Sequence, residues 1–394
     1  MKNDAPSKPA SRRTPLIDVL RAVAALVIAW HHFALYGPLS DWARPVAENV
    51  LYFVGHYARA TQIFFVVGGY VLARSMTRRN WNLRRVGRYV VHRYLRLGLP
   101  YLGAIALAIL ACHFGRDLLP EKTVGPHETW REFGVQLLAH LFFLQNILGY
   151  ESFSAGLWFV CINFQLSLVF VAMLWLRDAA TPNAEGAIRW PSAEPADPEA
   201  ENRFGPTIFT LLGWGMAAIA LFYFNRDHRW DVWFIYFFAH FYLGVVVYQS
   251  LSDPRKHYLF WLYVFMVLAA IVVDCLYVVH IEQRALQLRD IRWRLVTTLV
   301  SGVILFVGGR LGFMDTWPKS RVLDYLGRTS YSLFLIHFPV LVAVATVWTW
   351  LDWRNPWQAL AGLGFAYLLS LIVADVFYRL VESPSARLSR NVRY

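Results

Sequence analysis

The stretch IDVLRAVAALVIAWHHFALYG, residues 17–37, is long enough to cross a lipid bilayer as one helix. This apolar run contains an arginine, Arg21, and a histidine, His32, which follows eleven residues later. Eleven residues of α-helix advance about 16 Å and complete three turns plus about 20°, so the two side chains share one face. Ionisable groups at membrane depth typically face a cavity and take part in chemistry or transport. The segment therefore predicts a membrane-spanning helix that carries functional groups near both sides of the membrane.

The composition is that of an integral membrane protein. Of the 394 residues, 57% are hydrophobic and only 16% are charged, whereas a soluble domain has roughly 25% charged residues. Cys112, Cys161 and Cys275 show no paired spacing, so neither a disulfide framework nor a metal site is expected. The net charge of +12 comes from basic residues clustered at the ends of apolar segments. Membrane topology explains most of this excess, so membrane lipids rather than nucleic acid are the expected partners.

The apolar segments predict how often the chain crosses the membrane. Eleven candidates lie near 16–36, 50–74, 95–114, 133–150, 155–177, 207–224, 231–250, 257–280, 294–312, 324–349 and 357–381. The basic N-terminus, the basic C-terminal tail and the stretch 74–96, with eight arginines and no acidic residue, are all expected in the cytoplasm. Two cytoplasmic termini require an even number of crossings, so one candidate does not span.

The segment 133–150 is the weakest candidate, because it is short and contains His140, Gln145 and Asn146. A re-entrant or interfacial element is tolerated at membrane depth where it packs in protein or lines a cavity. The prediction is an all-α polytopic membrane protein of the inner (plasma) membrane, with about ten transmembrane helices plus one re-entrant or interfacial helix. Its expected parts are a cytoplasmic N-terminal tail (1–15), a membrane domain (16–382) with a flexible polar loop (178–205), and a cytoplasmic tail (383–394).

The first two apolar segments carry motifs of a known family. LIDVLRAVAALVIAWHH, residues 16–32, resembles the opening of the membrane acyltransferase-3 family, whose first helix reads roughly LDGLRGIAALLVVLHH. Arg21 and His32 keep the spacing of arginine and histidine in that family. FFVVGGY, residues 64–70, resembles the FFVLSGF of the family's second helix, with Gly68 in place of the serine.

Three later stretches resemble the same family in the same order. RRVGRYVVHRYLRLGLPY (84–101) resembles the approach to its third helix, where Arg93 and Arg96 form an Arg-x-x-Arg pair. LGRTSYSLFLIHFPV (326–340) resembles the late helix LGRISYSLYLWHWPV, and VESPSARL (381–388) resembles the closing pattern of the family. Residues 16–382 are therefore expected to form an acyltransferase-3-like membrane domain.

One block departs from the family pattern. Where the family often reads WSLSVEEQFYL, this chain reads LWFVCINFQLSLV, residues 157–169. Trp158 and Gln165 align, but Asn163 and Phe164 replace the two glutamates. An amide can orient a substrate hydroxyl but cannot usefully accept a proton, so an acid–base role for those carboxylates cannot operate here.

The resemblance implies an integral membrane O-acyltransferase. Such an enzyme moves an acyl group, acetyl being the commoner donor group, from cytoplasmic acyl-CoA to a hydroxyl of a cell-surface or exported carbohydrate or related acceptor. Acyl-CoA is then a donor substrate, and no bound cofactor is expected. A histidine can serve as base or acyl carrier, and clustered arginines suit the phosphates of CoA.

These expectations assign roles to individual residues. His32 and Arg21 are the expected catalytic residues, and Arg93 and Arg96 are expected to bind the donor. The residues expected to bind substrate are Trp158, Asn163, Gln165, Tyr331 and His337.

Each role has a structural alternative. Arg21 lies three residues after Asp18, a spacing that suits an ion pair within one helix. His32 suits a hydrogen bond to a neighbouring helix, and the adjacent His31 points about 100° away. Tyr331 and His337, six residues apart, lie about 120° out of alignment on a straight helix.

Two carboxylates favour a different class of protein. Asp274 and Asp375 lie inside apolar segments, where acyl transfer gives them no role. A multi-pass transporter or flippase for a polar or lipid-linked substrate is therefore the alternative to the enzyme, and a non-catalytic scaffold is a third class. The chain shows no internal repeat of the kind that many transporters have.

Overall fold

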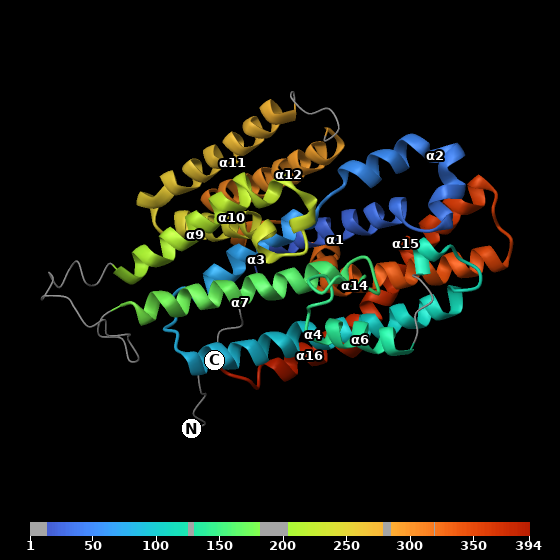
Figure 1. The fold of residues 1–394 in the computed structure, drawn as a ribbon, viewed down its shortest axis with the longest axis horizontal. Helices are drawn as coiled ribbons and strands as arrows, with labels where there is room; N and C mark the ends of the chain where they lie inside the picture. Colours follow the sequence, from blue (N-terminus) through green and yellow to red (C-terminus); the bar gives the residue numbers. More distant parts are fainter. Residues whose placement is uncertain (1–13, 125–129, 182–203, 279–284, 319) are drawn as a thin grey trace, which may run out of the picture.

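The computed structural model of the chain describes residues 14–124, 130–181, 204–278, 285–318 and 320–394. The helices of this part are α1 (Pro15–Leu35), α2 (Pro38–Tyr57), α3 (Thr61–Met76), α4 (Leu83–Gly115), α5 (Glu121–Val124), α6 (Trp130–Leu141), α7 (Leu157–Ala179), α9 (Phe204–Phe222), α10 (Phe234–Ser252), α11 (His257–Val278), α12 (Ala285–Arg310), α13 (Phe313–Thr316), α14 (Arg321–Trp350), α15 (Pro356–Phe377) and α16 (Ser383–Ser389). Figure 1 shows their arrangement. Short 3₁₀ turns η1 (Phe224–Arg226), η2 (His228–Trp230) and η3 (Pro254–Lys256) and a π-helical turn η5 (Tyr378–Glu382) complete the described elements.

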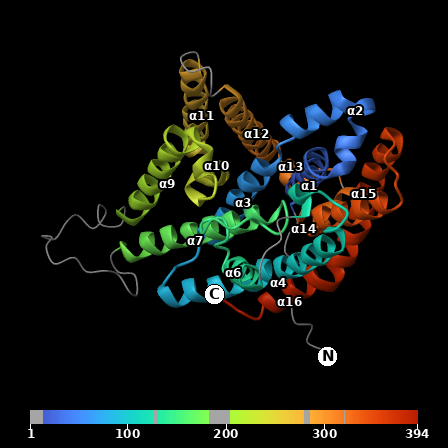
Figure 2. The same cartoon turned by 45° about the vertical axis from the view of Figure 1, so that its right-hand side comes forward.

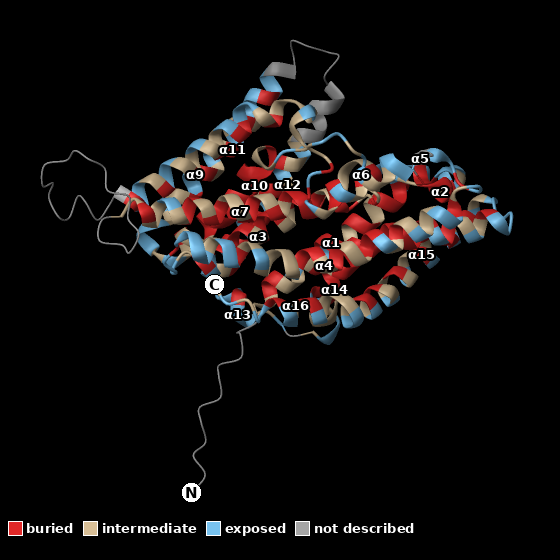
Figure 3. Ribbon diagram, turned by 60° about the horizontal axis from the view of Figure 1, so that its bottom comes forward, coloured by how far each residue is buried: buried red, intermediate tan, exposed pale blue. Residues whose placement is uncertain are grey.

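The fold class is that of a multi-pass membrane protein. The described residues contain no strand, and ten of their helical segments are long and apolar enough to cross a membrane. Large apolar side chains point outward on the peripheral helices, as on α11, where Phe265 is 69% exposed. Buried residues concentrate in the interior of the bundle (Figure 3). An apolar exterior around a packed interior suits a lipid environment, so the predicted all-α polytopic fold is confirmed.

The helices form two groups around a shared centre. α9, α10, α11 and α12 pack together on one side, whereas α2, α4, α14 and α15 pack together on the other (Figure 2). α1 and α3 lie between the groups, because α1 packs on α14 and α2 while α3 packs on α10 and α12. The helix with Arg21 and His32 is therefore central to the fold.

Two glycines let α3 and α10 cross at backbone contact. A Cβ atom on Gly69 of α3 would lie 1.9 Å from the carbonyl oxygen of Phe241, and one on Gly244 of α10 would lie 1.9 Å from that of Val66. Small residues of this kind allow close approach where lipid gives no hydrophobic drive for helices to associate. The crossing holds the two groups of helices together.

Both described ends of the chain lie on one side of the bundle. Arg74, at the end of α3, donates to the hydroxyl of Thr14 at 2.8 Å, and Arg79 donates to the carbonyl of Tyr394 at 3.1 Å. An even number of membrane crossings places both ends of a chain on the same side of the membrane. Of the predicted tail 1–15, residues 1–13 lie outside the described residues, as do 182–203 of the predicted loop 178–205. α16 and Tyr394, in the predicted tail 383–394, pack against α4.

The segment 133–150 is not among the ten candidate spans, as predicted. α6 has 12 residues, and the chain then leaves the helix through Phe143, whose φ is 58°. The following irregular stretch packs inside the protein, with Gln145 and Ser154 almost fully buried. Irregular backbone at this position fits an element that lines a cavity.

The boundaries of two spans differ from those expected. The predicted segment 50–74 is made of two helices, α2 and α3, and α2 begins at Pro38 with a kink at Ala47. Proline suits the first turn of a helix, and Pro45 inside α2 accounts for the kink. α4 extends from Leu83 through the arginine-rich stretch, because the side chain of Asn82 caps it by accepting from the backbone N–H of Arg85 at 2.9 Å.

Candidate functional site

His32 and His337 meet where α1 packs against α14. Nδ1 of His32 lies 2.6 Å from Nε2 of His337, and Nδ1 of His337 lies 3.0 Å from the carbonyl oxygen of Leu333. A carbonyl only accepts hydrogen bonds, so Nδ1 of His337 carries a proton. In the neutral pair, Nε2 of His337 then accepts from the N–H at Nδ1 of His32. This chain of hydrogen bonds leaves a lone pair on Nε2 of His32.

His32 lines a cavity of about 310 Å³. The cavity is bounded by residues from α1, α3, α7, α10, α12 and the irregular stretch after α6, among them Tyr36, Gln62, Asn146, Trp158, Phe237 and Arg294. His32 is only 8% exposed, and its Nε2 makes no hydrogen bond with a described residue. A neutral imidazole with a free lone pair at a cavity wall is equipped to accept a proton.

The cavity offers polar groups and aromatic faces to a ligand. Gln62 is 2% exposed, and its Oε1 has no hydrogen-bond partner among the described residues. The rings of Trp158 and Phe237 lie 5.3 Å apart on the wall. Burial raises the pKa of Asp231, also on the wall, although Arg294 and His228 oppose this shift. A buried amide without a partner is a group that a bound substrate can satisfy.

A second cluster lies about half the length of α1 away from His32, around Arg21. Arg93 and Arg96 of α4 and Glu382 of η5 act electrostatically on Arg21, as does Asp18. No hydrogen bond or ion pair joins the guanidinium of Arg21 to another described residue. Hence Asp18 does not hold Arg21 in the close ion pair that their spacing allows.

The cluster of Arg21, Arg93, Arg96 and Glu382, here called the arginine cluster, has an excess of positive charge. Nη2 of Arg93 lies 3.5 Å from Oδ1 of Asn163, while its Nε is buried and has no partner among the described residues. Glu382 accepts a 2.5 Å hydrogen bond from Ser332. Three guanidiniums with one carboxylate and an unsatisfied buried N–H make a site that fits an anionic ligand.

The structure divides the predicted site residues between these two places. Trp158 and His337 join His32 at or behind the cavity, whereas Asn163 joins Arg93. Tyr331 donates to the carbonyl of Leu97 at 3.0 Å, beside the arginine cluster. Tyr331 and His337 therefore serve different places, as their angular offset indicates.

Gln165 belongs to neither place. Its Nε2 lies 3.5 Å from the carbonyl oxygen of Phe143, so it faces the irregular stretch after α6. Sequence reasoning assigned no role to Gln62 or Ser332. A polar residue within the apolar run TQIFFVV, residues 61–67, is the signal that could have indicated Gln62.

His31, Asp274 and Asp375, which the sequence also singled out, each have a structural partner. His31 lines the cavity, and its Nδ1 lies 3.1 Å from the carbonyl oxygen of Val54. Asp274 forms an ion pair with Arg226 at 2.7 Å, and Asp375 forms one with Arg379 at 2.7 Å. The two intramembrane carboxylates are thus neutralised locally, which removes the observation that favoured a transporter. Among the described residues, no three His, Cys, Asp or Glu side chains gather as a metal site requires.

Comparison with known families agrees with this geometry. The family model Acyl_transf_3, described as an acyltransferase domain, matches residues 15–378. Comparisons with curated proteins and with solved structures gave no match. The family match contains α1 to α15, and with them the cavity, His32, His337 and the three arginines of the cluster. The chain therefore belongs to the acyltransferase-3 family and is a multi-pass membrane acyltransferase.

Proposed function

We propose that the enzyme transfers an acyl group, acetyl in the simplest case, from cytoplasmic acyl-CoA to a hydroxyl of a carbohydrate or related acceptor. The observation that carries this proposal is the oriented pair of His32 and His337, which presents a lone pair at the cavity. Attack by a hydroxyl on a thioester is assisted by a general base in contact with that hydroxyl. His32 has the position and the tautomer for this role.

The transfer step follows from that tautomer. Nε2 of His32 takes the proton of the acceptor hydroxyl while the oxygen attacks the thioester carbonyl. The imidazolium formed is stabilised because its Nδ1–H still donates to His337. The tetrahedral intermediate then breaks its carbon–sulfur bond, and the departing thiolate takes the proton from Nε2. The products are the ester and free CoA, and His32 returns to its neutral form.

The arginine cluster supports the choice of donor. Arg93 and Arg96 hold a diphosphate in this proposal, with Arg21 beside them on α1. About twelve bonds separate the 5′-diphosphate of CoA from its sulfur, and at roughly 1.2 Å per bond of an extended chain they span about 14 Å. Arg21 and His32 are about 16 Å apart along α1. A donor anchored by its diphosphate in the cluster therefore places its thioester near His32.

The distribution of arginines along the chain supports an orientation of the protein in the membrane. In this proposal the side of Thr14 and Tyr394 faces the cytoplasm and the membrane is the inner (plasma) membrane, which the arginine-rich stretch 74–96 supports. His32 lies in the last turn of α1, towards the opposite side. Trp158 offers a sugar ring an apolar face, while Gln62 and Asn146 offer hydrogen bonds to its hydroxyls.

Inverted membrane vesicles test this function, because they expose the cytoplasmic side to added donor. Vesicles with wild-type protein, His32→Ala or the control His113→Ala receive acetyl-CoA labelled in the acetyl group, and free CoA and captured label are followed. His113 is exposed on α4 and lies outside the cavity. We expect release and capture with wild type and His113→Ala, and at least a hundredfold less with His32→Ala.

Each other outcome has a defined meaning. Full activity in His32→Ala contradicts the role of His32 as base. No transfer by wild type from acetyl-CoA or succinyl-CoA, with carbohydrate acceptors added, contradicts acyl-CoA as the donor. The fraction that captures the label identifies the acceptor.

A further inference from the structure

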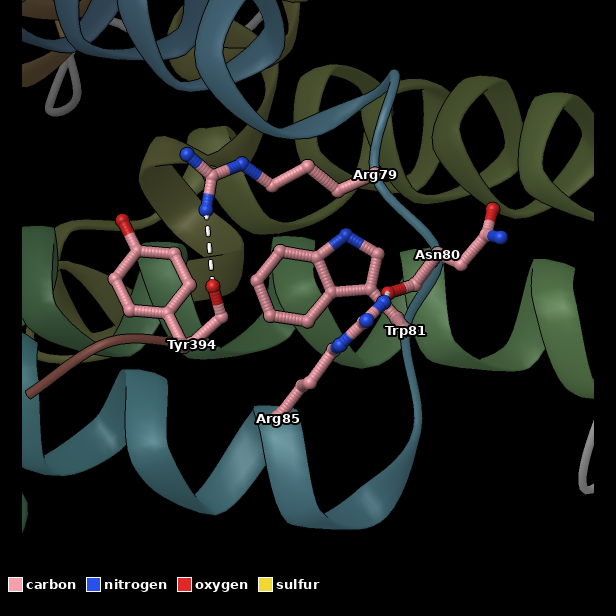
Figure 4. A pocket seen from close by; sticks show the side chains of 5 residues that line it. All are labelled: Arg79, Asn80, Trp81, Arg85 and Tyr394. Atoms are coloured by element: carbon pink, nitrogen blue, oxygen red, sulfur yellow. Dashed lines mark hydrogen bonds between the residues drawn. The ribbon is translucent and has the colours of Figure 1, made fainter.

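A pocket on the side of Thr14 and Tyr394 has no part in the proposed transfer step. It measures about 250 Å³ and is lined by Arg79, Asn80, Trp81, Arg85 and Tyr394 (Figure 4). Arg79, Asn80 and Trp81 belong to the connection from α3 to α4, and Arg85 lies in the first turn of α4. Tyr394 follows α16 and packs against this connection.

The aromatic wall of the pocket is built into the protein rather than exposed to lipid. Trp81 is 4% exposed, its backbone N–H donates to Asp178 at 2.5 Å, and its indole N–H donates to the carbonyl of Met76 at 3.2 Å. A tryptophan that anchors a membrane protein at the lipid interface exposes its ring to the headgroups. Trp81 does not do so, because the protein around it holds its ring in place at the wall of the pocket.

Cations and aromatic faces lie together in this pocket. The guanidinium of Arg79 lies 5.0 Å above the ring of Tyr394, and the rings of Trp81 and Tyr394 lie 6.0 Å apart at an angle of 23°. Arg85 is held by a 2.5 Å hydrogen bond to the carbonyl of Asn80. None of the described side chains that line the pocket is acidic. Such a site fits a ligand that has both a planar ring and a phosphate.

Tyr394, on the wall of the pocket, also contacts the helix α4 that carries Arg93 and Arg96 of the arginine cluster. The ring of Tyr394 lies 4.9 Å from that of His92, and the charges of Arg93 and Arg96 act on its hydroxyl. Eight residues of α4 separate Arg85 from Arg93, a rise of about 12 Å. In CoA, the adenine and the ribose 3′-phosphate lie on the side of the diphosphate that is opposite to the pantetheine arm. A diphosphate in the cluster with its arm towards His32 directs the nucleotide towards this pocket.

We propose that the pocket binds the 3′-phosphoadenosine end of the donor, an inference that rests on the proposed acyl-CoA donor. Arg79 and Arg85 bind the 3′-phosphate, and the rings of Trp81 and Tyr394 contact the adenine. The pocket then selects CoA thioesters over other thioesters, while the chemistry remains with His32.

Donors of decreasing size test this assignment in the full-length protein. Acetyl-CoA has both groups that the pocket is proposed to bind, the adenine and the 3′-phosphate. Acetyl-dephospho-CoA lacks the 3′-phosphate, and acetyl-pantetheine lacks both groups. They are compared in wild type, in the double variant Arg79→Gln/Arg85→Gln and in the control Arg84→Gln. Arg84 is a neighbouring exposed arginine that does not line the pocket.

The double variant is expected to raise the KM for acetyl-CoA about tenfold or more. Its KM for acetyl-pantetheine stays at the wild-type value, and its preference for acetyl-CoA over acetyl-dephospho-CoA falls towards one. Arg84→Gln behaves as wild type. An unchanged KM for acetyl-CoA in the double variant overturns the inference, as does an equal loss with acetyl-pantetheine. Equal elution volumes and melting temperatures show that the variants are folded.

A binding measurement separates this inference from the proposed function. Adenosine 3′,5′-bisphosphate is titrated calorimetrically into the purified protein, in detergent and in nanodiscs with or without phosphatidylglycerol. We expect saturable binding to wild type and Arg84→Gln and at least tenfold weaker binding to the double variant. Absence of binding to wild type overturns the pocket assignment whatever the activity assay shows. Loss of binding only with phosphatidylglycerol assigns the pocket to lipid headgroups, and binding without acyl transfer refutes the donor proposal alone.

Discussion

His337 accepts a hydrogen bond from His32 across the α1–α14 interface, with Nε2 and Nδ1 2.6 Å apart. His337 is itself held by the carbonyl of Leu333 one helical turn earlier. The backbone of α14 therefore determines which nitrogen of His32 carries the proton. His337 is fully buried, so in the proposed mechanism it acts through His32, as a positioning residue.

Removal of this acceptor should slow the reaction. His337→Leu is expected to lower kcat about 10- to 100-fold with little change in the donor KM, because His32 loses its orientation but the arginine cluster is intact. His337→Gln should recover part of kcat, since its amide oxygen can accept from His32. Initial rates with acetyl-CoA measure both variants. Identical losses in the two variants, or a raised donor KM, would contradict a positioning role.

Arg93 should contribute to donor affinity rather than to the chemical step. Arg93→Ala is expected to raise the donor KM about tenfold, and Arg93→Lys should restore only part of it because an ammonium group lacks the bidentate fork. Arg88→Ala, an exposed arginine of the same helix, is the control. A loss confined to kcat in Arg93→Ala would place Arg93 in the reaction instead.

Neighbouring glycines of α3 should differ sharply in their tolerance of a methyl group. Gly69→Ala is expected to destabilise the protein by about 3 kcal/mol or more, because the new Cβ would overlap the carbonyl of Phe241. Gly68→Ala should keep or raise the melting temperature, since its Cβ would lie 3.8 Å from Asn163 and alanine favours a helix. Thermal unfolding followed by intrinsic fluorescence compares the two, and equal melting temperatures would refute the backbone contact.

Asp274 should affect stability without affecting acyl transfer. It is 1% exposed, and its contact with Arg226 at 2.7 Å is an ion pair rather than a well-aligned hydrogen bond. Asp274→Asn is expected to lower the free energy of unfolding by about 3 kcal/mol, because it leaves a partly buried guanidinium without its counter-charge. kcat and donor KM at 25 °C should stay at wild-type values. A selective loss of acyl transfer in folded Asp274→Asn would give Asp274 a functional role.

His140 should make the protein sensitive to mild acid. Burial lowers the pKa of His140 to about 4, although a hydrogen bond to the carbonyl of Gln136 opposes this shift. The unfolded chain binds a proton near pH 6.5 and the folded protein does not, so stability falls as the pH drops from about 6.5 to about 4, by roughly 3 kcal/mol. The neutral ring also accepts from the N–H of Phe153 at 3.3 Å, a bond that protonation removes.

Melting temperatures between pH 7.5 and pH 4.5 test this effect. The wild type should lose more stability than His140→Gln, whose side chain retains an acceptor without a titrating group. Parallel curves for the two proteins would show that His140 does not titrate in this range.

Local regularity accounts for what the sequence could predict. The helical repeat alone places Arg21 and His32 on one face of α1, and in the structure His32 lines a cavity while Arg21 lies among other charged residues. The same repeat separates Tyr331 from His337. Charge and length together also single out 133–150 as the segment that does not span.

Contacts between distant parts of the chain could not be predicted in this way. His32 and His337 are 305 positions apart, and no local pattern says that α1 packs on α14 in the register that joins them. The division of Trp158 and Asn163 between two places depends on what packs on each face of α7. Gln62 and Asn146 line the same cavity only because the irregular stretch after α6 reaches it from a distant part of the sequence.

α1 sets a fixed distance within the protein, because a rigid helix keeps Arg21 and His32 at a constant separation. For a donor that is bound by its phosphates at the arginine cluster, this distance determines which carbonyl group lies beside the imidazole of His32. In the proposed mechanism, a small donor such as acetyl phosphate would hold its acetyl group near Arg21, about 16 Å from His32. A CoA thioester bound by its diphosphate would bring its carbonyl to the same position beside His32 whatever its acyl chain. Discrimination between short and long acyl groups must then be made by the space beyond His32, in the cavity rather than at the arginines.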